Sequence, residues 1–152
     1  MNVLLIEDND DHASSIREDL QFAYEGSVQI KTAPLLRDGL NMLEEWLDAE
    51  ILLGDLNLPD SSCTDTTDKL VELNISQPVV VLTSLADLKI AKRLLKKGIQ
   101  DYVTKDNLSP ELLFKACEYA LERKKAQRTL DAEVQEKKFF LPSTFARFSQ
   151  CN

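Results

Sequence analysis

The sequence predicts an α/β fold in which five parallel strands form one doubly wound sheet, and two features predict it. Short apolar runs recur five times, and four of them are followed by a segment whose apolar residues are spaced three or four positions apart, while the pattern over residues 64–73 is weaker. Several runs are apolar at nearly every position, as is typical of strands buried on both faces. A strand-helix order repeated five times, (βα)5, implies parallel strands with helices on both faces of the sheet.

The first two strand-helix units have clear apolar patterns. Residues 2–6 form a continuous apolar run and predict the first strand. Acidic residues follow, which suits the start of a helix because the helix dipole favours negative charge there. Alternation over residues 27–33 predicts the second strand. Apolar residues at helical spacing mark the two helices, the first by Ala13, Ile16, Leu20 and Ala23, and the second by Leu36, Leu40, Leu43 and Leu47 with Trp46 beside them.

Three further units complete the predicted sheet. Pro78 precedes the most β-branched of the strands, and the basic amphipathic helix that follows it ends at Gly98, a residue suited to a helix C-terminus. Ser109 and Pro110 suit the N-cap and first turn of the last helix. The predicted elements are strands at residues 50–55, 79–82 and 101–105, and helices at residues 64–73, at residues 86–97 and after Ser109.

The last helix is longer than one domain of this kind needs. An imperfect stripe continues through Gln127, Leu130 and Val134, within a stretch where charges of both signs are mixed. Four phenylalanines then gather around Pro142. We therefore expect one domain over residues 1–125, with an extended C-terminal helix and a Phe-rich tail over residues 126–152 that serve as a linker or a dimerisation segment.

Composition excludes several classes of protein. The chain has 43% apolar and 29% charged residues, as a soluble globular protein does, and no run approaches the roughly 20 apolar residues of a membrane helix. The first apolar run is too short for a signal peptide, so we expect a cytoplasmic protein. A net charge of -8 argues against a nucleic-acid surface. The chain has three widely spaced cysteines and one histidine, a pattern that indicates neither a disulfide framework nor a zinc site. We expect that histidine, His12, at the surface.

Polar residues stand where four of the predicted strands end. Glu7 and Asp8 follow the first strand, Asp55 ends the third, Thr83 ends the fourth, and Lys105 ends the fifth. The C-terminal ends of parallel strands lie along one edge of a sheet, which is where open α/β sheets bind ligands. A doubly wound strand order would bring these residues into one pocket.

Crowded carboxylates need a counter-charge. Oxygen ligands without Cys or His favour Mg²⁺, with Asp8 and Asp55 as carboxylate ligands and the nearby Asn57 offering a backbone carbonyl. Lys105 supplies a point charge for an incoming anion, and Thr83 can donate a hydrogen bond to it. Phosphoryl transfer requires mainly positioning and charge neutralisation, so a bare aspartate, Asp55, can be the nucleophile.

These residues resemble the receiver domain of two-component response regulators over about residues 2 to 125. The resemblance is carried by Glu7-Asp8, by Asp55 in LGDLNLPD, by Thr83 in VLTS, and by Tyr102 and Lys105 in GIQDYVTK. It implies a flavodoxin-like fold and transfer of a phosphoryl group from a histidine kinase or a histidine phosphotransfer protein to Asp55, with Mg²⁺ held by Glu7, Asp8, Asp55 and Asn57. It also implies that Thr83 and Tyr102 act as switch residues that remodel the surface of the fourth helix, fifth strand and fifth helix. A homodimer can form through this surface. The resemblance further implies that the chain is a signalling switch rather than an enzyme.

The sequence departs from the family pattern at a few positions. Glu7 replaces the commoner Asp, and Gly54 stands where an aliphatic or small residue is usual, which predicts a looser third strand. Cys63 stands where Gly commonly ends the loop after the phosphoacceptor, and Asp106 follows Lys105 where Pro is frequent. None of these changes removes a chemical group from the predicted pocket.

Two other functions compete with the phosphorylated switch. A pseudo-receiver would serve only as a dimerisation or scaffold module through the long helix. A phosphatase of the haloacid dehalogenase type also uses Asp and Mg²⁺, but it requires a second Asp two positions after the nucleophile, where this chain has Asn57. No output domain is recognisable in the sequence.

Overall fold

The computed structural model describes the backbone of residues 1–150 and the side chains of residues 1–66 and 68–138. Five strands form one sheet: β1 (Asn2–Ile6), β2 (Gln29–Ala33), β3 (Ile51–Asp55), β4 (Val79–Thr83) and β5 (Asp101–Thr104). Five α-helices and two short 3-10 turns connect and follow them: α1 (Asp10–Ala23), α2 (Leu36–Glu45), α3 (Cys63–Glu72), η1 (Leu85–Asp87), α4 (Leu88–Lys96), η2 (Lys105–Asn107) and α5 (Pro110–Gln150).

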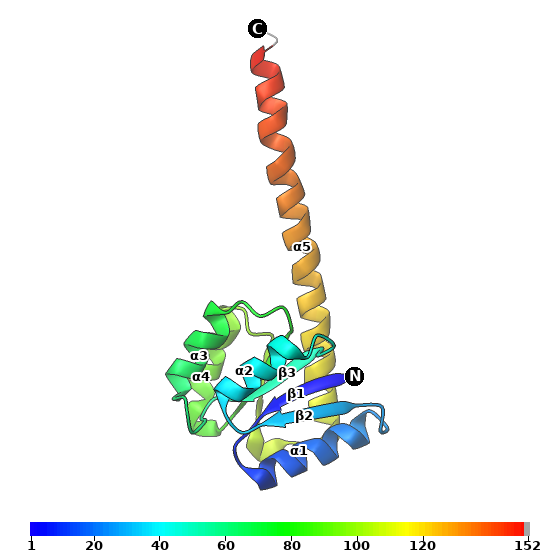
Figure 1. Cartoon of the computed structure of the whole chain (residues 1–152), viewed down its shortest axis with the longest axis vertical. Coiled ribbons are helices and arrows are strands. Elements are labelled where there is room, and N and C mark those ends of the chain that lie inside the picture. Colours follow the sequence, from blue (N-terminus) through cyan, green and yellow to red (C-terminus); the bar gives the residue numbers. More distant parts are fainter. Residues whose placement is uncertain (151–152) are drawn as a thin grey trace.

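The sheet is wholly parallel, with the strand order β2-β1-β3-β4-β5. This is the doubly wound, flavodoxin-like arrangement that the sequence predicts. Figure 1 shows β1 between β2 and β3. All five residues of β3 and all five of β4 are buried, because helices cover both faces of the central strands.

Two apolar layers hold the helices on the sheet. On one face Leu20 of α1 and Leu113 of α5 pack against β1 and β3, and all of these side chains are fully buried. On the other face Leu36 of α2, Leu70 of α3 and Leu94 of α4 pack against the alternate residues of the same strands. The period-2 alternation of side chains along each strand divides the core into these layers.

One prediction about the second helix is wrong. α2 ends at Glu45, where the Trp46 amide donates to the carbonyl of Met42, and the chain then turns away. Leu47 therefore does not continue the apolar stripe, and it is 87% exposed. Trp46 is buried beside α2 as predicted, and its ring lies 4.4 Å from the Lys31 ammonium.

α5 projects far beyond the rest of the domain (Figure 1). Its 41 residues, at about 1.5 Å per residue, span about 60 Å. Where it leaves the domain, cationic side chains donate to backbone carbonyls: Arg123 to Gln100, Lys124 to Ile75 at 3.2 Å, and Arg128 to Ser76. The helical backbone continues through the Phe-rich segment to Gln150, and the phenylalanine side chains of that segment lie outside the described residues.

Candidate functional site

The strand order brings the predicted polar residues to one edge of the sheet. β1, β3, β4 and β5 are consecutive neighbours, and their C-terminal ends carry Glu7, Asp55, Thr83 and Lys105 in that order across the edge. Parallel pairing with matched register places these ends side by side.

Three carboxylates cluster at this edge. Glu7, Asp8 and Asp55 each offer an oxygen, and these oxygens all lie within 4.8 Å of one another. Glu7 is 3% exposed and Asp55 is 8% exposed, whereas Asp8 faces solvent. Negative charges that lie this close together repel one another, so a cation in contact with the cluster is stabilising.

Lys105 provides part of that compensating charge. Its ammonium lies 2.6 Å from Glu7 Oε2 and donates to Asp55 Oδ2 at 2.8 Å. Burial raises the pKa of Glu7, and the interaction with the Lys105 ammonium only partly offsets that effect. Burial also lowers the pKa of Lys105, but its interactions with Asp55 and Glu7 outweigh this effect, so the pKa of Lys105 lies above its usual value. The lysine therefore remains charged at neutral pH.

Hydrogen bonds from the adjoining loops fix the two buried carboxylates. Glu7 Oε1 accepts from the Asn9 amide at 3.2 Å, and Asp55 Oδ1 accepts from the Asn57 amide at 3.2 Å. Asn9 also caps α1, because its side chain accepts from the His12 amide at 3.0 Å. His12 is exposed, as expected, yet its Nδ1 lies 3.4 Å from the Lys105 ammonium at the rim of the cluster.

The two residues predicted to switch lie on neighbouring strands. Thr83, at the end of β4, is 1% exposed, and its hydroxyl donates to the carbonyl of Ser84 at 3.1 Å rather than to Asp55. Tyr102 on β5 is half-buried and packs against the core layer that includes α4. The fold thus places Thr83 on the strand next to that of Asp55, and Tyr102 against the core layer to which α4 contributes.

The sequence pattern does not predict that Asp87 lies at this edge. Asp87 accepts hydrogen bonds from the side chains of Asn57 and Ser84, at 2.8 and 3.1 Å. An acid three residues after Ser84, at the start of a basic helix, resembles an ordinary helix cap in sequence. Only the fold shows that its carboxylate reaches the loop after β3.

The donor set suits a hard divalent cation. The described residues near the cluster offer carboxylate and backbone oxygens, and the cluster includes no thiol or imidazole ligand. Glu7 Oε2 is buried and, among the described residues, has the ion pair with Lys105 but no well-formed hydrogen bond. Glu7, Asp8 and Asp55 therefore fit the Mg²⁺ that the sequence analysis expects.

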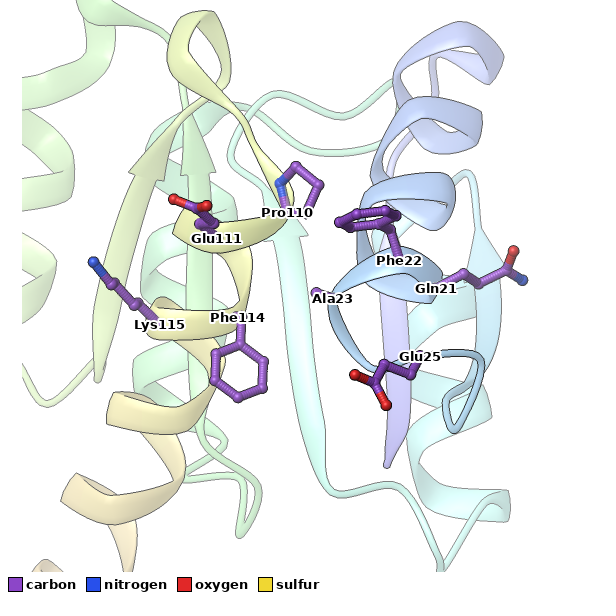
Figure 2. A pocket seen from close by; sticks show the side chains of 8 residues that line it. All are labelled: Gln21, Phe22, Ala23, Glu25, Pro110, Glu111, Phe114 and Lys115. Atoms are coloured by element: carbon purple, nitrogen blue, oxygen red, sulfur yellow. The ribbon is translucent and has the colours of Figure 1, made fainter.

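A separate cleft of about 730 Å³ lies between the end of α1 and the first turns of α5 (Figure 2). Phe22, which is 76% exposed, and Phe114, which is 40% exposed, supply its apolar surface, while Glu25, Glu111 and Lys115 supply charge. None of the lining residues belongs to the acid cluster, so the cleft is distinct from the site at the strand ends.

A doubly wound sheet with carboxylates and a lysine at the carboxyl ends of its strands is the architecture of a response regulator receiver. The chain belongs to this family: the family model of the response regulator receiver domain matches residues 3–118. The chain is thus a receiver domain of two-component systems, a class that in general consists of signalling switches. Among the described residues, no helix is both long enough and apolar enough to cross a membrane.

The comparisons with individual proteins agree with the family. The chain is 35% identical over 113 residues to the cell cycle response regulator CtrA of Brucella ovis and to that of Brucella suis biovar 1, matching 74% of this chain and 47% of each relative. It therefore spans about half the length of these curated relatives. A receiver domain protein from Clostridium thermocellum superposes with a TM-score of 0.66 at 25% identity, covering 83% of this chain and 98% of that one. A CheY-like receiver from Methanospirillum hungatei has the same fold, with a TM-score of 0.68 at 21% identity, over 83% of this chain and 97% of that one.

Proposed function

We propose that this chain is a phosphorylatable receiver in which Asp55 accepts a phosphoryl group from a histidine kinase or a histidine phosphotransfer protein. The observation that carries the proposal is the contact of Lys105 with both Glu7 and Asp55, within a cluster of three carboxylates. One acid would neutralise Lys105 in a structural ion pair, whereas this site has two buried acids and a third carboxylate, Asp8, beside them, which suits the uptake of a cation.

The transfer reaction uses few groups. A carboxylate oxygen of Asp55 forms a bond to phosphorus as the bond between phosphorus and the donor's imidazole nitrogen breaks, and that nitrogen leaves with the electron pair. Lys105 balances charge on the phosphoryl oxygens, and Thr83 turns its hydroxyl from Ser84 towards them. Mg²⁺ held by Glu7, Asp8, Asp55 and the Asn57 carbonyl would neutralise negative charge shared by the carboxylates and the phosphoryl group.

The expected response is a change of the surface formed by α4, β5 and α5. Tyr102 packs against the layer that includes α4, so an inward movement of its ring after Thr83 moves would alter how α4 sits on the sheet. The partners are the phosphodonor protein and a second copy of this chain, which would bind through that surface and the projecting part of α5. Leu130 and Val134 on this part of the helix are 60% and 51% exposed and suit such pairing.

The two competing functions have less support. A pseudo-receiver would not need a lysine placed between two buried carboxylates. A phosphatase of the haloacid dehalogenase type is disfavoured because the chain belongs to the receiver family and has Asn57 where such an enzyme requires a second Asp. The net charge of -8 continues to favour a protein partner over nucleic acid.

The deciding experiment is the intact mass after incubation with acetyl phosphate and Mg²⁺. Wild-type protein should gain one phosphoryl group, Asp55→Asn should gain none, and Asp68→Asn, which alters an exposed carboxylate on α3, should behave as wild type. An undiminished mass gain in Asp55→Asn would show that Asp55 is not the acceptor.

A further inference from the structure

A chain of hydrogen bonds joins the loop after Asp55 to the loop after Thr83. Asn57 Nδ2 donates to Asp87 Oδ2 at 2.8 Å, and Ser84 Oγ donates to the same oxygen at 3.1 Å. At one end the Asn57 amide binds Asp55 Oδ1, and at the other the Thr83 hydroxyl binds the Ser84 carbonyl. One carboxylate oxygen of Asp87 therefore connects the proposed phosphoacceptor loop to the proposed switch residue.

Local helix capping does not explain the side chain of Asp87. The residue occupies the N-cap position of α4, where an aspartate ordinarily accepts a hydrogen bond from an amide of the first turn. Its side chain makes no such bond, and the hydroxyl of Ser84, which precedes η1, makes none either. Both polar groups are used instead in the link to Asn57, thirty residues away.

We propose that Asp87 is a positioning residue that holds the loop after β4 in its resting arrangement and thereby sets how readily Thr83 turns towards Asp55. This inference rests on the proposed function. The Ser84 carbonyl accepts both the Thr83 hydroxyl and, at 3.1 Å, the Asp87 amide. Thr83 must give up this acceptor to reach a phosphoryl group, so whatever fixes Ser84 in place also opposes the switch.

The link should change the switching equilibrium by a few-fold. Asn57 and Ser84 are exposed and Asp87 is half-buried, so each of the two hydrogen bonds lies at the weak end of the usual range. Losing both should favour the switched state by about fivefold, which corresponds to about 1 kcal/mol.

The negative charge of Asp87 offers a competing explanation, because any nearby carboxylate repels a phosphoryl group. Two variants separate the alternatives. Asp87→Asn removes the charge but retains an oxygen that accepts both hydrogen bonds, whereas Ser84→Ala removes one hydrogen bond and no charge. The proposed link predicts that Asp87→Ala has the largest effect, Ser84→Ala an intermediate one and Asp87→Asn an effect below about twofold. Charge repulsion alone predicts equal effects of Asp87→Ala and Asp87→Asn and none of Ser84→Ala.

The test measures binding of beryllofluoride, an analogue of the phosphoryl group, with Mg²⁺ present, together with amide NMR spectra without either. Asp87→Ala should bind beryllofluoride about fivefold more tightly than wild type. In the unliganded spectra, its Thr83 and Ser84 amide resonances should lie part of the way towards their positions in the liganded wild type, which a loss of general stability would not produce.

The outcomes test the proposed function and the role of Asp87 separately. If wild-type protein does not bind beryllofluoride, the proposed function fails, and the role of Asp87 fails with it. If wild type binds but Asp87→Ala and Ser84→Ala have wild-type affinity and wild-type unliganded spectra, the proposed function stands and the role of Asp87 is refuted. Equal tightening in Asp87→Ala and Asp87→Asn assigns the effect to charge and also refutes it.

Discussion

Replacing Lys105 by methionine tests how strongly the acid cluster depends on its single ammonium. The side chains of Glu7, Asp55 and Lys105 are 1%, 11% and 17% exposed. Removing one partner from a fully buried ion pair costs about 3–5 kcal/mol, and the partial exposure of Asp55 and Lys105 screens some of this. We therefore expect Lys105→Met to lose about 2 kcal/mol of unfolding free energy at pH 7, which lowers Tm by about 4–8 °C.

The pH dependence of this loss follows from the pKa of Glu7. Burial already raises that pKa above its usual value of 4.5, and loss of the Lys105 ammonium should raise it further. Between pH 4.5 and the folded-state pKa, the folded variant binds more protons than the unfolded chain, so stability falls as the pH rises through that window. The deficit against wild type should therefore be small near pH 4.5 and larger at pH 7.

Urea unfolding at several pH values measures the deficit, provided that the dependence on urea is the same in both proteins. Lys92→Met is the matched control, because Lys92 is an exposed lysine of α4 and its loss should change stability by less than about 0.5 kcal/mol. Added Mg²⁺ should narrow the gap by binding the folded acid cluster. Equal unfolding midpoints for the two variants at pH 7 would refute the view that Lys105 neutralises buried charge.

Three further predictions concern stability and assembly. Gly54→Ala should stabilise the domain by about 0.5–1 kcal/mol in urea unfolding, since a Cβ there meets no atom within 4 Å. Gly39→Ala should destabilise the domain, because its Cβ would overlap the side chain of Ile6. The opposite order of stabilities would contradict this packing. Gln100→Ala should cost about 1–3 kcal/mol, because the buried side chain accepts from the Val79 amide at 2.7 Å, and an unchanged midpoint would show that water replaces it. Truncation after residue 126 should weaken self-association in sedimentation, and identical behaviour of the long and short chains would exclude pairing through the end of α5.

The sequence by itself determines most of the local structure and the composition of the site. Continuous apolar runs define the central strands, and residues such as Asp55 and Thr83 stand at strand ends whatever the strand order is. The expected loosening of the third strand by Gly54 is not seen in its pairing, because Gly54 stays in register with Ile6 and with Val81. Periodicity is less informative at helix ends, which is why it predicts Leu47 on a helix that ends at Glu45.

Contacts between distant segments are decided only by the tertiary structure. The order of strands in the sheet brings Lys105 within 2.8 Å of Asp55, fifty residues earlier, and it brings Asp87 to Asn57. The cleft beside Phe22 and Phe114 likewise exists only because α1 and α5 share one face of the sheet. Periodicity records which face of an element is buried, but the partner across that face depends on the packing of the whole chain.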